Sequence, residues 1–251
     1  MQKSTITHIL MLSASLSCLS PHAWAAHPLV TEDPNVQTQG KQQWELNTDA
    51  RRSNLTAQAN QQISALTYTY GASDQLDVFF NLPGRLNQFA GVADASAGVK
   101  YLFAQNAQHS YGVKLEAFIP SGAERKGLSD NAYQLSTTLI HSYHQDQLTV
   151  HSNVYMNWHH YRDEQASSAQ HTTVWRLSGA ALYEFRPGWQ AVLDLGLISP
   201  ESRQEKRWQR YQTVGLIYAC TPNLDIDAGL QWKQTQTSRS HQLGIGLAWR
   251  Y

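Results

Sequence analysis

Cysteine is almost absent from this chain of 251 residues, which contains only Cys18 and Cys220. Cys18 falls within a predicted leader, so the rest of the chain keeps a single thiol. One thiol can build neither a disulfide framework nor a cysteine-based zinc site. The stability of the folded chain must therefore come from another source.

Net charge is absent as well, because 19 basic side chains balance 19 acidic ones. Proteins that bind nucleic acids normally carry a basic patch or arm, so no nucleic-acid partner is expected. Long apolar runs are also missing, since none approaches the roughly 18–20 residues that a membrane-spanning helix requires. This absence excludes a helical membrane protein.

Residues 1–26 have the features of a cleaved signal peptide. Lys3 supplies a positive start, an apolar stretch follows, and Ala23–Ala25 supplies a small-x-small cleavage site. Lipidation at Cys18 is the less favoured alternative, because Ser15 stands where a branched apolar residue is usual. The leader predicts export to the periplasm or the outer membrane.

From Gln42 to the end, apolar and polar residues alternate with the period of two that is typical of β-strands. Helical periodicity is nowhere sustained. In the last segment, one face carries Leu243, Ile245, Leu247, Trp249 and Tyr251, and the other carries Gln242, Gly244, Gly246, Ala248 and Arg250. The pattern predicts twelve strands at 43–49, 62–70, 75–82, 93–103, 110–119, 133–143, 147–158, 173–185, 189–198, 209–220, 224–232 and 241–251.

The connections between these strands alternate between short and long. Tight turns are expected at 71–74, 104–109, 144–146, 186–188 and 221–223, and longer polar loops at 50–61, 83–92, 120–132, 159–172, 199–208 and 233–240. Outer-membrane barrels have this asymmetry, with short periplasmic turns and longer outer loops. A soluble β-sandwich, the alternative, explains the alternation of residues but not the alternation of loop lengths.

Aromatic residues sort to the two strand ends, as amphipathic rings do at membrane interfaces. The end with the short turns holds Trp44, Tyr68, Tyr70, Tyr101, Phe103, Tyr111, Tyr143, Tyr183, Phe185, Trp189, Tyr218, Trp249 and Tyr251, and the other holds Phe80, Tyr133, Trp158, Trp175 and Trp232. We therefore predict an all-β fold for residues 42–251, a transmembrane antiparallel β-barrel of about twelve strands. It would lie in outer-membrane lipid, and its last strand, 241–251, would engage the outer-membrane assembly machinery.

Charged residues lie on the strand faces opposite the apolar ones. An Arg or Lys turned to lipid at mid-bilayer would cost roughly 2–4 kcal/mol, so these side chains should line the lumen. Two interpretations stay open: the charges neutralise one another, or they contact a solute. The predicted lumen-lining residues are Glu45, Asp77, Lys100, Lys114, Glu116, Arg176, Glu184, Asp194, Asp225, Asp227 and Arg250.

Candidate catalytic and metal sites are weaker. The histidines at 141, 144, 151, 159 and 160 do not converge on the predicted strands, and the spacing of Asp225 and Asp227 follows from alternation alone. Ser136, His151 and Asn153 face inward and form the nearest hydrolase set, but no nucleophile motif marks them. We expect no enzyme, metal or cofactor. A structural or adhesive barrel that acts through its outer loops is a further alternative.

The segment before the first strand carries a family resemblance. Residues 27–33 read HPLVTED, 39–41 read QGK and 44–47 read WELN. This opening resembles that of a bacterial family of transporters described as phenol-degradation meta-pathway proteins. The resemblance implies an outer-membrane channel that takes up small solutes, aromatic or other hydrophobic compounds among them.

Two parts of the chain are candidates for controlling such a channel. The N-terminal segment 27–41 is polar and contains proline, and we expect it to enter the barrel from the periplasmic side as a plug. The loops 120–132 and 159–172 are the longest and are expected to act as gates. The sequence thus predicts an outer-membrane channel or passive transporter for small solutes.

Overall fold

The computed structural model describes residues 27–55 and 60–251. The predicted signal peptide, residues 1–26, lies outside the described residues. The strands are β1 (Gln42–Ser53), β2 (Asn60–Ser73), β3 (Leu76–Arg85), β4 (Gly91–Val92), β5 (Ser96–Gln105), β6 (His109–Phe118), β7 (Ala132–Gln145), β8 (Leu148–Tyr161), β9 (Thr173–Arg186), β10 (Trp189–Ile198), β11 (Gln209–Thr221), β12 (Leu224–Gln234) and β13 (Arg239–Arg250). A short helix, α1 (Glu164–Ala169), and a 3-10 turn (Glu124–Lys126) lie in two of the loops.

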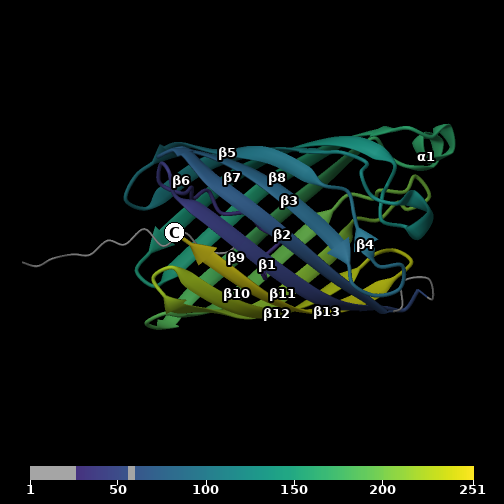
Figure 1. Cartoon of the computed structure of the whole chain (residues 1–251). Helices are drawn as coiled ribbons and strands as arrows, with labels where there is room; N and C mark the ends of the chain where they lie inside the picture. Colours follow the sequence, from purple (N-terminus) through teal and green to yellow (C-terminus); the bar gives the residue numbers. More distant parts are fainter. Residues whose placement is uncertain (1–26, 56–59) are drawn as a thin grey trace, which may run out of the picture.

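The strands of the described chain form one closed antiparallel barrel (Figure 1). Each long strand pairs with its neighbours in sequence, and β1 pairs with β13, where Trp44 lies opposite Trp249. The two-residue β4 only extends the edge of β3, so the other twelve strands make the ring. Closure leaves no strand edge of this ring unpaired. An unpaired edge is not tolerated in lipid, because its backbone N–H and C=O groups would lack hydrogen-bond partners. The predicted twelve-stranded barrel is confirmed.

Most of the observed strands run further than the alternation of residues indicates, although β5 begins at Ser96 and not at the predicted residue 93. Only β10 has the predicted bounds, whereas β1 continues from the predicted end at 49 to Ser53 and β8 continues from 158 to Tyr161. Backbone pairing continues beyond the bilayer into water, where side chains on both faces are polar and the period-two signal is lost. The short turns gather at one end of the barrel and the long loops at the other (Figure 1).

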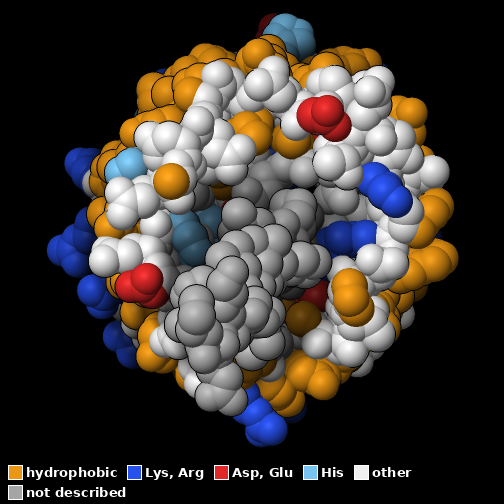
Figure 2. All heavy atoms as spheres, turned by 90° about the vertical axis from the view of Figure 1, so that its left-hand side faces the viewer, with side chains coloured by type: hydrophobic (Ala, Val, Ile, Leu, Met, Phe, Trp, Pro, Cys, Tyr) orange, Lys and Arg blue, Asp and Glu red, His pale blue; other side chains and the backbone are white. Residues whose placement is uncertain are grey.

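The outer surface of the barrel is apolar. Outward side chains such as Leu139, Leu243 and Ile245 are 54%, 54% and 60% exposed. Figure 2, seen from the short-turn end, shows hydrophobic side chains around the circumference. A continuous apolar surface of this extent needs a nonaqueous partner, and in a closed barrel that partner is lipid. The protein is therefore an outer-membrane barrel.

Aromatic rings meet in pairs at the short-turn end. The ring centroids of Trp189 and Tyr218 lie 4.3 Å apart, and those of Trp44 and Tyr68 lie 4.6 Å apart.

Within the described chain, no helix is long and apolar enough to cross a membrane.

The interior is mostly polar and holds one small apolar cluster. Ala180, Leu182, Val192 and Ile217 come from β9, β10 and β11 and pack with Leu29 of the N-terminal segment. Polar side chains dominate elsewhere, and Asp77, for example, is 1% exposed. Buried carboxylates need partners, and these partners define the candidate site.

Candidate functional site

The N-terminal segment, His27–Lys41, lies inside the barrel. Its exit is a turn in which Lys41 donates its N–H to the Thr38 carbonyl, and Gly40 donates to the Gly71 carbonyl of β2. The segment contacts the inner wall in sequence on β12, β10, β8, β6 and β3, through Asp227, Asp194, Asn153, Lys114 and Asp77. The wall residues thus hold the segment on several sides.

Asp194 accepts more hydrogen bonds than any other of these five wall residues. Its carboxylate accepts the N–H groups of Val30 (2.6 Å) and Thr31 (2.9 Å) and the hydroxyls of Thr31 (2.7 Å) and Tyr211 (3.1 Å). Asp194 is 0% exposed. Because a charged acceptor strengthens each of these bonds, Asp194 fixes the middle of the segment to β10.

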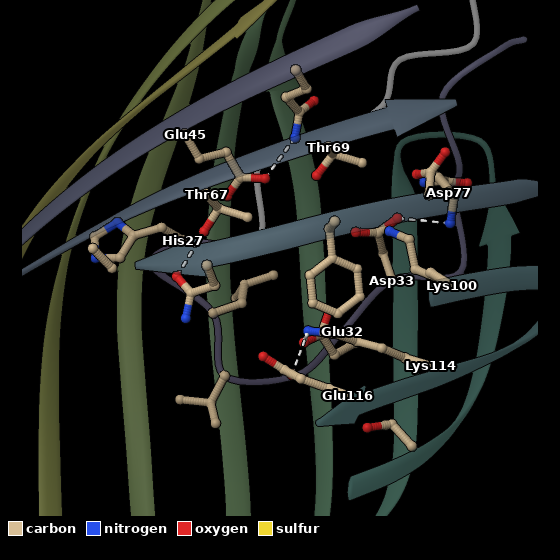
Figure 3. Close-up of a pocket in the computed structure, with 18 of the residues that line it drawn as sticks. His27, Glu32, Asp33, Glu45, Thr67, Thr69, Asp77, Lys100, Lys114 and Glu116 are labelled. Carbon is tan, nitrogen blue, oxygen red and sulfur yellow. Dashed lines mark hydrogen bonds and ion pairs between the residues drawn. The ribbon is translucent and has the colours of Figure 1, made fainter. Parts of the chain in front are cut away.

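Lys114 joins the segment to β6. Its Nζ lies 2.6 Å from a Glu32 oxygen and 3.4 Å from a Glu116 oxygen, and it also lies over the Phe79 ring. Figure 3 shows Lys114 and Glu116 close to Glu32. Burial acts to raise the pKa of Glu32, but the positive charges of Lys114 and Lys100 outweigh it and lower that pKa.

Asn153 of β8 also binds Glu32, through the backbone of Glu32. Its side-chain oxygen accepts the Glu32 N–H at 2.6 Å, and its Nδ2 donates to the Glu32 carbonyl at 3.0 Å. The two bonds satisfy both backbone groups of Glu32, as a neighbouring strand would.

A chain of hydrogen bonds connects the segment with the strands that close the barrel. Asp77 accepts the Gln37 N–H at 2.9 Å, and Gln37 Nε2 donates to Gln43 Oε1 at 3.1 Å. Gln43 Oε1 also accepts from Arg250, whose other nitrogen lies 2.6 Å from Asp225. The hydrogen bonds that hold Gln37 are thus connected with the paired strands β1 and β13, which close the barrel.

His27 marks the other end of the segment. Its Nδ1 contacts Asp227, and its Nε2 lies 3.4 Å from Asp49. Burial acts to lower the pKa of His27, but hydrogen bonds to the two carboxylates outweigh it and raise the pKa to about 9. A protonated His27 therefore bridges β12 and β1.

Glycines on the inner wall leave room for the segment. A Cβ atom at Gly229 would lie 2.4 Å from the Pro28 Cβ, and one at Gly215 would lie 2.7 Å from the Pro28 Cγ. A side chain at either position would collide with the proline. Glycine at these two positions therefore allows the segment to dock against the wall.

Two cavities flank the segment. The larger, about 370 Å³, lies between the segment and the wall of β1, β2, β3, β5 and β6, with contributions from β7, β8 and β9; the smaller, about 180 Å³, lies toward β11–β13. Phe79 and Phe118 give the larger cavity an aromatic surface. Its charged wall residues are Glu45, Asp77, Lys100, Lys114, Glu116 and Arg176, six of the residues predicted to line the lumen.

The other predicted lumen residues make contacts elsewhere. Glu184 accepts the Gly188 N–H at 3.0 Å and stabilises the β9–β10 turn. Asp194 and Asp227 hold the N-terminal segment, while Asp225 and Arg250 pair with each other. Contact of any of the eleven with a solute stays a prediction.

Residues of the N-terminal segment were missing from the predicted set. His27 pairs with Asp227 of the wall, and Glu32 pairs with Lys114. The available signal was their charge in a polar segment directly before the first strand. Period-two reasoning cannot place residues that lie outside a strand.

The candidate hydrolase residues do not come together. On the paired strands β7 and β8, Ser136 lies opposite Asn157, whereas His151 lies opposite Ser142 and bonds to it at 2.5 Å. Ser136 and His151 are therefore well separated along the barrel wall. In the described part of the chain, no three His, Cys, Asp or Glu side chains are arranged to hold a metal ion.

The comparisons with known proteins agree with this architecture. A family model described as "Putative MetA-pathway of phenol degradation" matches residues 26–251. The structure resembles an outer-membrane channel from Pseudomonas putida F1, with a TM-score of 0.71, 14% identity, and coverage of 87% of this chain and 98% of that one. No curated protein matches the sequence.

Two further solved barrels are similar in fold. The NanC porin has a TM-score of 0.63 at 15% identity, covering 81% of this chain and 98% of its own. CymD, described as a monoaromatic hydrocarbon channel, has a TM-score of 0.50 at 8% identity, covering 85% of this chain and 89% of its own. At these identities the likeness concerns the fold.

Proposed function

Since the chain belongs to the family described as "Putative MetA-pathway of phenol degradation", we propose that it is an outer-membrane channel for passive uptake of small solutes, aromatic compounds among them. The observation that carries this proposal is the larger cavity, in which aromatic and charged side chains share one wall. The description of CymD as a monoaromatic hydrocarbon channel supports the same solute class.

The wall chemistry suits an aromatic ring that carries a hydroxyl or carboxyl group. Phe79 and Phe118 offer surfaces against which a ring can pack, and Lys100 and Glu116 offer polar partners for its substituent. A channel needs sites that bind weakly and release quickly. The mixed lining, without a deep apolar pocket, meets that need.

The N-terminal segment is the constriction in this proposal. It lies across the interior between the two cavities, so a solute must pass beside it or displace it. The loops at 120–132 and 159–172, which contain the 3-10 turn and α1, are the proposed outer gates. The last strand would provide the contact with the assembly machinery.

Conductance in planar bilayers tests the channel. The purified barrel should give discrete current steps, and proteoliposomes should take up phenol and benzoate faster than protein-free vesicles do. A deletion strain should grow more slowly on aromatic carbon sources and normally on glucose. A folded barrel that gives neither current nor uptake would favour a structural or adhesive role, and ester hydrolysis by the purified barrel would favour an enzyme.

A further inference from the structure

A hollow of about 900 Å³ lies on the outer face of strands β9–β13, toward the long-loop end. Each strand contributes three consecutive residues, at 177–179, 195–197, 210–212, 232–234 and 239–241. The first and third residue of each triplet point outward, as the exposure of Leu177, Leu195, Leu197 and Trp232 shows. The hollow therefore opens to the surroundings of the barrel and is separate from the lumen.

Cationic side chains gather in the outer part of this hollow. Arg210 lies opposite Gln234 on β12, and Gln234 lies opposite Arg239 on β13, so two guanidinium groups flank one amide. Gln234 Oε1 accepts from Arg210 at 2.8 Å, which orients that guanidinium. In the next row of outward residues, farther along the strands from the long loops, His241 lies opposite the exposed Arg52 of β1.

The positive charge of this cluster is uncompensated. Among the described residues, no carboxylate lines the hollow. Arg210 and Arg239 form no ion pair with any of the described residues. Arginines on a lipid-facing surface are tolerated near the interface and costly at mid-bilayer. The cluster therefore lies where an anionic headgroup can reach it.

The lining changes from basic to apolar around the barrel as well as along the strands. In the row of Arg210 and Arg239, Leu197 lies opposite both Arg210 and Leu177, so the part of this row on β9 and β10 is apolar. One row farther from the long loops lie Leu195, Gln212, Trp232 and His241, and the row after that contains Val214, Leu230 and Leu243. A ligand that fits this gradient has an anionic head and a hydrocarbon body. An acidic protein would match the arginines but not the leucines at bilayer depth.

We propose that the hollow is a binding site for a phosphorylated lipid of the outer leaflet. Arg210 and Arg239 bind the phosphate, since guanidinium groups match phosphate oxygens in geometry and charge. The acyl chains lie along Leu177, Leu195, Leu197 and Trp232. The site is independent of the proposed transport, because it is on the opposite side of the wall from the cavities.

Native mass spectrometry of the detergent-solubilised barrel tests the site, with bisphosphorylated lipid A, its monophosphoryl form and phosphatidylcholine as probes. Lipid A should bind best. The double variant R210Q/R239Q should weaken its binding about 25-fold, because each arginine contributes roughly fivefold. The matched control R125Q/R162Q removes two exposed arginines from other outer segments and should bind as the parent does.

Each other outcome counts against the proposal. Equal binding of lipid A and phosphatidylcholine, or unchanged binding by R210Q/R239Q, would reduce the hollow to ordinary contact with bulk lipid. Displacement of lipid A by millimolar inorganic phosphate would identify a free-anion site, and binding of a polyglutamate peptide in place of lipid A would identify a protein-docking surface. Heat-modifiable gel migration verifies folding of each variant, and the single variant R239Q serves if the double variant fails to fold.

Discussion

Thr31 and Asp194 meet through two hydrogen bonds inside the barrel, one from the Thr31 N–H at 2.9 Å and one from its hydroxyl at 2.7 Å. One residue belongs to the N-terminal segment and the other to β10. Both are nearly inaccessible, with 1% and 0% exposure. This contact makes the inner wall a binding surface for the protein's own N-terminal segment.

Replacing Asp194 with Asn should loosen the middle of the segment. Asn offers one acceptor oxygen in place of two and no charge, so docking should weaken by about 1–3 kcal/mol. Hydrogen exchange measures this, and the amides of Val30 and Thr31 should lose protection. The matched control D130N, on the outer β6–β7 loop, should leave both amides protected. Equal protection in D194N and the parent would contradict the role of Asp194.

Deleting residues 27–40 should enlarge the conducting path. The deletion joins the cavities of about 370 and 180 Å³ on either side of the segment. Single-channel conductance should therefore rise several-fold, and heat-modifiable gel migration should show that the barrel still closes. An unchanged current from a folded deletion variant would exclude the segment as the constriction.

The barrel was predictable because it depends on local pattern, and segment 27–41 was expected to enter it. The individual contacts that dock this segment were not predictable, because they join residues that are distant in the sequence. Alternation along a strand requires Asp194 and Asp227 to face inward, whatever they contact. Their partners, Thr31 and His27, lie 163 and 200 residues away along the chain. No spacing rule connects such positions, so the inward charges could be interpreted only as mutual neutralisation or solute contact.

Raising the pH should release the end of the segment at His27. Its pKa is raised to about 9, so its stabilising charge is fully present below the ordinary value of 6.5 and is lost as the pH rises through about 9. Proteolysis of the N-terminal segment should therefore accelerate between pH 8 and 10. The variant H27Q should show faster cleavage already at pH 7 and no further change across this range.

Glu32 should control the segment at the opposite end of the pH scale. Its pKa is lowered, so its contribution is present above the ordinary carboxyl range and is lost as the pH falls through the lowered value. Conductance should rise in strong acid, where the Lys114 pair breaks. The variant E32Q should show the higher conductance at neutral pH and a flat acid response. An acid response retained in E32Q would assign it to another carboxylate.

Substituting alanine for Gly229 should displace Pro28. The added Cβ would lie 2.4 Å from the Pro28 Cβ, whereas one at Gly179 would lie 3.5 Å from its nearest neighbour, in ordinary contact. Since overpacking typically costs about 1–3 kcal/mol, G229A should expose the segment to protease and raise conductance, and G179A should do neither. In a deletion variant that lacks residues 27–40, G229A should have no effect, because the atom it collides with is gone. A destabilised barrel in that background would instead mean that Gly229 serves the curvature of β12.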